Sequence, residues 1–229
     1  MHQELLKILT KRISKYYNFA LDHIIAPPFC IYCKQFLTAR SIFCFDCYDM
    51  IEPIVSVQLR ITKSHSMNVM AACGYKEPVK SLILGKARSD KIASEQLGQL
   101  IWQYTYFKHL PCDYLVPIPL HWMRYAKRGY NQAEEIAHVL AREKNIGVEN
   151  ILYRTKNTPF QSSIAFDQRL ENVKNVFSLK TNSPEEYYNK HFVIVDDLMT
   201  TGATLQSAAK ALLPLKLASI NAIVACRVI

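Results

Sequence analysis

Two neighbouring aspartates, Asp196 and Asp197, follow an apolar run in the stretch VIVDDLMTTGATL (Val193–Leu205). Adjacent carboxylates repel each other and are costly to bury, so we expect them to meet a polar ligand or a cation. A strand that ends on this pair would bring it to the carboxyl edge of a sheet, where ligands of open α/β sheets bind. The carboxylates can accept hydrogen bonds from a sugar diol, directly or through Mg²⁺.

The residues after the aspartates suit a phosphate. Backbone N–H groups at a helix start bind phosphate together with hydroxyl groups, and a glycine permits close backbone approach. The candidate phosphate ligands are Thr200, Thr201, Gly202, Ala203 and Thr204. The segment therefore predicts a ribose 5-phosphate site; the alternative is an acid pair at a strand end that only caps the next helix.

Four of the seven cysteines form two C-x2-C pairs, separated by ten residues: Cys30, Cys33, Cys44 and Cys47. Each pair places two thiolates on one turn, and two pairs complete the tetrahedral four-sulfur set that zinc prefers. Such a site has no open coordination position, so the ion would fold the local chain and not catalyse. An iron–sulfur cluster or a redox pair is the alternative.

Apolar periodicity indicates that strands and helices alternate through most of the chain, which predicts an α/β fold with a parallel sheet covered by helices on both faces. Strands are expected at residues 68–75, 113–119, 189–197 and 219–229, helices at 89–107, 133–144 and 204–213, and a basic loop at 120–132. Helical and strand signals fade between about Met50 and Asn68. We therefore expect two domains, residues 1–52 and 53–229.

The remaining features concern partners and location. Residues 5–25 have the period of a basic amphipathic helix, which would pack on its own domain or lie on a membrane surface. No apolar run approaches the roughly 20 residues that span a bilayer, so we expect a cytoplasmic protein without stable membrane insertion. The net charge of +9 favours polyanionic partners such as nucleic acid or phosphorylated small molecules.

The stretch VIVDDLMTTGAT resembles the phosphoribosyl diphosphate (PRPP) fingerprint of type I phosphoribosyltransferases, in which two acids bind the ribose hydroxyls and the threonine–glycine loop binds the 5-phosphate. Together with the four-cysteine module and the segments 115–137 and 161–177, the chain resembles the ComF/GntX family of competence-associated proteins over essentially its whole length. The resemblance implies a type I phosphoribosyltransferase-like domain with an N-terminal zinc-ribbon-like module.

Further site residues follow from this resemblance. The run PIPLH is similar to the family's pyrophosphate loop, and Arg guanidinium groups suit a diphosphate because they offer forked donors. The implied pyrophosphate ligands are Pro119, Leu120, His121, Arg124 and Arg128, and the candidate cleft or DNA contacts are Lys86, Arg88, Lys127 and Arg169. Solvated surface charges are the alternative for the basic residues. Thr200 stands where purine-salvage transferases have an aspartate base, and Thr cannot serve as that base at neutral pH.

Three functions are compatible with these features. The family resemblance and the basic charge favour a competence protein that acts in natural transformation (DNA uptake), handling incoming single-stranded DNA in the cytosol, and binds PRPP with Mg²⁺. The second is an active phosphoribosyltransferase that displaces diphosphate from PRPP with a nitrogen nucleophile. The third is a zinc-ribbon adaptor that docks a DNA-uptake helicase or a recombination mediator, with the α/β domain as a scaffold.

Overall fold

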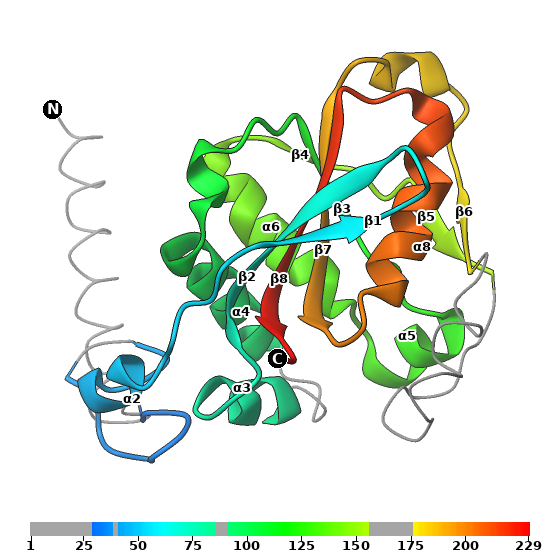
Figure 1. Ribbon diagram of the computed structural model, residues 1–229. Helices are drawn as coiled ribbons and strands as arrows, with labels where there is room; N and C mark the ends of the chain where they lie inside the picture. Colours follow the sequence, from blue (N-terminus) through cyan, green and yellow to red (C-terminus); the bar gives the residue numbers. More distant parts are fainter. Residues whose placement is uncertain (1–28, 39–40, 86–90, 156–175) are drawn as a thin grey trace, which may run out of the picture. The chain divides into compact units, whose positions relative to one another are not determined.

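The computed structural model of the chain describes residues 29–38, 41–85, 91–155 and 176–229 (Figure 1). The described residues fall into two compact units that meet in sequence between Ile51 and Glu52. The first contains the four cysteines and one short helix, α2 (Phe45–Asp49). The expected helix at residues 5–25 lies outside the described residues.

In the second unit, six strands of the described chain form one sheet in the order β1-β2-β8-β7-β3-β4 (Figure 1). Their bounds are β1 (Val57–Arg60), β2 (Ser66–Gly74), β3 (Tyr114–Pro117), β4 (Gly147–Val148), β7 (His191–Met199) and β8 (Ser219–Arg227). Only β1 runs antiparallel to its neighbour; every other pairing in this sheet is parallel. The expected α/β class with a parallel sheet is confirmed, apart from the antiparallel edge strand β1.

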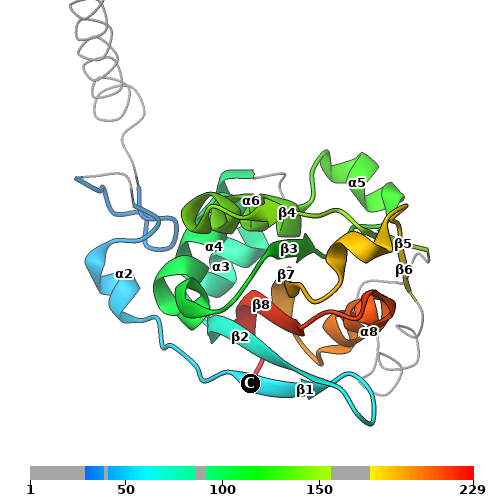
Figure 2. The same cartoon turned by 90° about the horizontal axis from the view of Figure 1, so that it is seen from above.

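Helices cover both faces of this sheet, as Figure 2 shows. On one face lie α3 (Val79–Gly85), α4 (Lys91–Tyr104) and α6 (Gln132–Lys144); α4 packs on β2 and β8, and α6 on β3 and β7. On the other face α8 (Ala203–Leu212) packs on β7. The helices expected at 133–144 and 204–213 are therefore present within one residue, and the one expected at 89–107 is α4 followed by the 3₁₀ turn η3 (Tyr106–His109).

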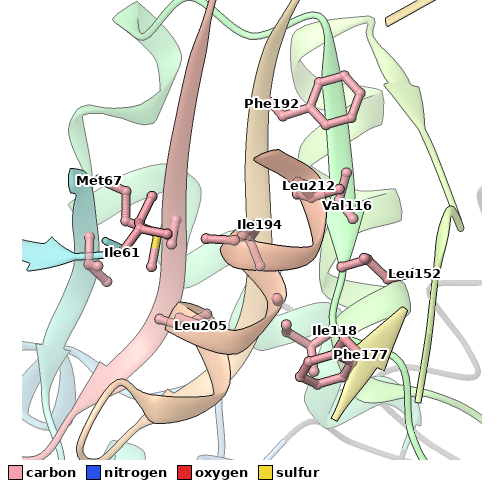
Figure 3. Packing of buried hydrophobic residues seen from close by; sticks show 14 of the residues in the cluster. Ile61, Met67, Val116, Ile118, Leu152, Phe177, Phe192, Ile194, Leu205 and Leu212 are labelled. Atoms are coloured by element: carbon pink, nitrogen blue, oxygen red, sulfur yellow. The ribbon is translucent and has the colours of Figure 1, made fainter. Parts of the chain in front are cut away.

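The core between the sheet and α8 explains why β7 is so apolar. Phe192 and Ile194 of β7 are fully buried and face Leu205 and Leu212 of α8 across this core (Figure 3). Val193 and Val195 point to the other face and are fully buried as well, because helices cover both sides. The sequence of a central parallel strand is therefore a continuous apolar run, without the alternation of apolar and polar residues seen in strands with one exposed face.

Two expectations about local structure were wrong, and two strand features were not predicted. Residues 53–68 contain β1, a short edge strand of alternating burial that the sequence signal did not reveal. The segment 120–132, expected to be a basic loop, contains a helix, α5 (Trp122–Arg128). Its sequence has no helical period of apolar residues because its aromatic side chains are exposed. Strand β7 continues to Met199 and does not end on the aspartates. A small hairpin of β5 (Leu152–Arg154) and β6 (Phe177–Leu179) was not expected.

Among the described residues, no helix has both the length and the apolar character needed to cross a membrane.

The packing of α4 on α6 generates a prediction about stability. A Cβ atom on Gly98 of α4 would lie 2.7 Å from the Cβ of Val139 on α6, so Gly98→Ala must push the two helix backbones apart. We expect a loss of about 1–3 kcal/mol in the free energy of unfolding, although alanine favours the helix itself. Chemical denaturation measures this loss, with Gln99→Ala at an exposed position of α4 as the control. A Gly98→Ala variant as stable as the control would contradict the close contact.

Candidate phosphate site and cysteine cluster

The parallel pairing of β3 with β7 brings two predicted site segments to one edge of the sheet. Pro117 at the end of β3 is in register with Val195, and the Ile118 N–H donates to the Val195 carbonyl at 2.9 Å. The next residue of β7 is Asp196. The segment Pro119–His121 therefore leaves the sheet at the edge that carries the two aspartates, as expected for ligand sites at the carboxyl ends of parallel strands.

The aspartate pair is partly exposed at this edge. Asp196 and Asp197 are both half-buried, whereas the four residues before them on β7 are fully buried. The backbone N–H of Asp197 donates to Oδ1 of Asp196 at 2.8 Å, which fixes the direction of that carboxylate. The pair is thus held on a rigid strand and remains within reach of solvent, as a site for hydroxyl groups or a cation requires.

The turn after β7 has the features expected of a phosphate site. Gly202 adopts φ of 79°, in the left-handed region that glycine reaches without strain, and α8 begins at the next residue. The Ala203 N–H donates to Oγ1 of Thr201 at 3.4 Å. The first turn of α8 contains no acidic residue, so nothing within the helix offsets the positive end of its dipole. An anion at this turn would be stabilised by the dipole and by backbone donors.

The segment after β3 is fixed by two helix caps. His121 is buried and precedes α5, and its Nδ1 accepts from the Met123 N–H at 3.4 Å. Asn131 caps α6: its Oδ1 accepts from the Ala133 N–H, while its Nδ2 donates to the Ile118 carbonyl at 3.0 Å. Asn131 was not among the predicted site residues, although an Asn before a helical pattern is a recognisable cap signal.

The other predicted residues are distributed unevenly. Pro119 and Leu120 are half-buried in the segment between β3 and α5, and the basic residues Arg124, Lys127 and Arg128 all belong to α5. Lys86, Arg88 and Arg169 lie outside the described residues. Within the described part of the chain, the structure thus brings the aspartates, the threonine–glycine turn and the PIPLH segment to one region of the sheet.

Helix α5 presents aromatic side chains to solvent. Trp122 is 71% exposed, Tyr125 50% and Met123 43%. Large apolar side chains at this exposure on one short helix, between basic residues, form a surface on which planar ligands can stack. The helix is kept short by Gly129, which ends it in the left-handed conformation at φ of 79°.

The four predicted metal ligands come together in the first unit. The Sγ atoms of Cys30, Cys33, Cys44 and Cys47 all lie within 4.8 Å of one another, and those of Cys33 and Cys44 are 3.6 Å apart. Sulfur atoms about 2.3 Å from a tetrahedral zinc ion lie about 3.8 Å from each other. The donor set therefore fits a metal ion such as zinc.

Backbone hydrogen bonds favour ionisation of the Cys30 thiol. Burial raises its pKa, but hydrogen bonds from the backbone of Cys44, Cys33 and Tyr32 outweigh burial and lower the pKa of Cys30 to about 6. In contrast, burial and neighbouring thiols raise the pKa of Cys47. Backbone donors around one sulfur are typical of metal-binding thiolates, because they stabilise negative charge on the ligand.

Comparisons with known proteins agree with this geometry. Residues 125–229, which include β7 and the turn before α8, match the model of the phosphoribosyl transferase domain family. The chain is 29% identical to the DNA utilization protein YhgH of Escherichia coli, over 69% of this chain and 71% of that protein. It is 39% identical to the competence protein ComFC of Bacillus subtilis over a shorter region, 43% of this chain and 38% of that protein.

A third relative is matched over most of both chains. The competence protein F of Haemophilus influenzae is 30% identical over 194 residues, which cover 81% of this chain and 78% of that protein. The described four-cysteine cluster and the mostly parallel sheet are consistent with this relationship. The chain therefore belongs to the family of competence protein F, ComFC and YhgH, and it carries a phosphoribosyl transferase domain.

Proposed function

We propose that this protein acts in DNA uptake, as the names of its relatives indicate for them, and that its second unit binds PRPP or a related 5-phosphoribose with Mg²⁺. The ligand assignment rests on the carboxyl edge of the sheet at β3 and β7. There the acid pair lies on β7, and the phosphate-type turn follows it directly, before α8. Asp196 and Asp197 would accept from the ribose hydroxyls, and the turn at Gly202 would hold the 5-phosphate.

The segment Pro119–His121 and the arginines of α5 would hold the diphosphate, and bound Mg²⁺ would offset part of its negative charge. Among the described residues, the groups at this edge of the sheet suit binding of such a ligand. Thr200 offers no base at neutral pH to activate a nitrogen nucleophile, so an acceptor would need another proton acceptor.

The aspartate pair generates the first prediction about function. Asp196→Asn and Asp197→Asn replace a charged acceptor by a neutral amide, and each should weaken Mg–PRPP binding about 10- to 100-fold, since hydrogen bonds to charged groups contribute about 1.5–3 kcal/mol. Isothermal titration calorimetry measures the affinity. The charge-matched control is Glu143→Gln, which changes an exposed acid near the carboxyl end of α6. Unchanged affinity in both aspartate variants would exclude this site.

We propose that the cysteine cluster holds one structural zinc ion. Cys112 provides a contrast within the same chain: it is not a member of the cluster, and burial raises the pKa of Cys112 to about 12, so it remains a protonated thiol. We expect native mass spectrometry to find one zinc ion per wild-type chain and per Cys112→Ser chain, and none retained by Cys47→Ser after dialysis. Zinc retention by Cys47→Ser equal to that of the wild type would contradict a four-sulfur site.

We further propose that α5 contacts incoming single-stranded DNA. Its exposed Trp122 and Tyr125 provide stacking surfaces, and every nucleobase has a face on which such rings can stack. The net charge of +9 favours the phosphate backbone. An active phosphoribosyltransferase would need an acceptor site, and an adaptor for a helicase or recombination mediator would need a docking contact. No observation on the part of the chain that the structure describes favours either of them.

A salt series tests this assignment. The logarithm of the DNA affinity should fall linearly with the logarithm of salt concentration, because phosphate contacts release counterions. Trp122→Ala should weaken binding at least about fivefold, since stacking contributes about 1–3 kcal/mol per base. Tyr188→Ala, an exposed aromatic before the amino end of β7, serves as the control. Fluorescence anisotropy with labelled oligonucleotides measures the salt dependence and the affinities of the variants. Equal DNA affinities of Trp122→Ala and Tyr188→Ala would argue against α5 as the DNA contact.

A further inference from the structure

Strand β1, which no predicted site residue belongs to, makes direct contact with the phosphate-type turn. A Cβ atom on Gly202 would lie 2.9 Å from Cδ2 of Leu59 and 3.0 Å from Cε of Met199. These distances show that both side chains pack against the backbone of the turn itself. A larger residue at position 202 would collide with them, in addition to being strained at φ of 79°.

A second contact joins the same strand to the helix that follows the turn. Nε2 of Gln206 donates to the carbonyl of Arg60 at 2.6 Å. The backbone N–H of Gln206 donates to the Gly202 carbonyl at 2.9 Å. One residue in the first turn of α8 is therefore hydrogen-bonded both to β1 and to the turn.

Strand β1 is itself held by contacts that do not involve the turn. It pairs with β2, with Leu59 opposite Met67. Met67 and Ile61, which follows β1, are buried in the core that also contains Leu205 (Figure 3). Before the strand, Nη2 of Arg227 donates to the Val55 carbonyl at 3.3 Å. The strand can thus act as a fixed support.

Such a support bears directly on phosphate binding. A turn binds an anion well only if its N–H groups already point at the ligand, because ordering them on binding costs free energy. Glycine is the residue that most readily leaves its conformation, since it has access to more of φ/ψ space than any other. A side chain packed on Gly202 and an amide anchored one helical turn later restrict this freedom.

We propose that Leu59 and Gln206 are positioning residues that hold the turn from Thr200 to Thr204 in the conformation that receives a phosphate. This inference rests on the proposed function in one respect, namely that the turn binds the 5-phosphate. Neither residue touches the ligand; both act through the backbone of the turn.

The test uses the full chain with the variants Leu59→Ala and Gln206→Met, which remove the apolar contact and the amide donor. Gln58→Ala, on the neighbouring exposed position of β1, is the matched control, and Leu59→Met is the conservative variant that retains the contact. Hydrogen exchange of the backbone amides 200–204 without ligand reports the conformation of the turn. Calorimetry with ribose 5-phosphate reports its affinity.

We expect Leu59→Ala and Gln206→Met to accelerate exchange at these amides about tenfold and to weaken ribose 5-phosphate about three- to tenfold, with Gln58→Ala and Leu59→Met close to the wild type. Exchange that is unchanged in both test variants would overturn the inference. If exchange is accelerated in the test variants but the wild type does not bind ribose 5-phosphate, the proposed function is refuted. The positioning of the turn by β1 would still be supported. Because the two variants alter different contacts, misfolding of one leaves the other informative.

Discussion

The register between β3 and β7 is the constraint on which the rest of the candidate site depends. It is fixed at the amino ends of the strands, where the Asp113 N–H donates to the His191 carbonyl and the His191 N–H donates to Oδ2 of Asp113 at 2.7 Å. A shift by one residue would turn every β7 side chain to the opposite face. Since both faces of β7 are buried, neighbouring core packing would also be lost. The register therefore sets which residues follow the strands at the carboxyl edge.

The strand and the turn offer opposite electrostatic environments within a short distance. The aspartates favour hydroxyl groups and cations, whereas the start of α8 favours anions. Because β7 continues through Leu198 to Met199, these two residues of nearly extended chain separate Asp197 from Thr200, and three rises of about 3.3 Å give a spacing of about 10 Å. The two environments can therefore serve different parts of one ligand, the sugar and its phosphate, without the carboxylates repelling the phosphate at close range.

The sequence predicted those parts of the structure in which local pattern and tertiary packing agree. The central strand β7 and helices α6 and α8 were expected close to their observed bounds, because their burial on one or two faces produces a clear period. The four-cysteine cluster was also predicted, since two C-x2-C turns bring their own sulfur atoms together.

The elements that were missed lack such a pattern. Helix α5 exposes its aromatic side chains, so it has no apolar stripe, and its bounds are set by caps at His121 and Gly129. Strand β1 has four residues and one solvated face. The contact of Leu59 with Gly202 joins residues 143 positions apart in the chain through an edge strand that pairs with neither β7 nor β8. No local signal in one sequence reports a contact of this kind.

The described part of the cysteine unit buries few apolar residues, in contrast to the sheet. Its described residues are 29–38 and 41–51, and beyond the cysteines they bury only Ile42, Phe43 and Ile51 among the apolar residues. The unit ends at Ile51 and is small. Units below about 70–80 residues rarely gain more than about 3–5 kcal/mol from a hydrophobic core, and small natural domains commonly add a metal ion or disulfides. None of the seven cysteines is in a disulfide, and four of them converge at distances suited to one ion. A bound metal ion would thus add cross-links to the few buried apolar residues of the described part of the unit, whereas the sheet is stabilised by strand pairing and a large buried core.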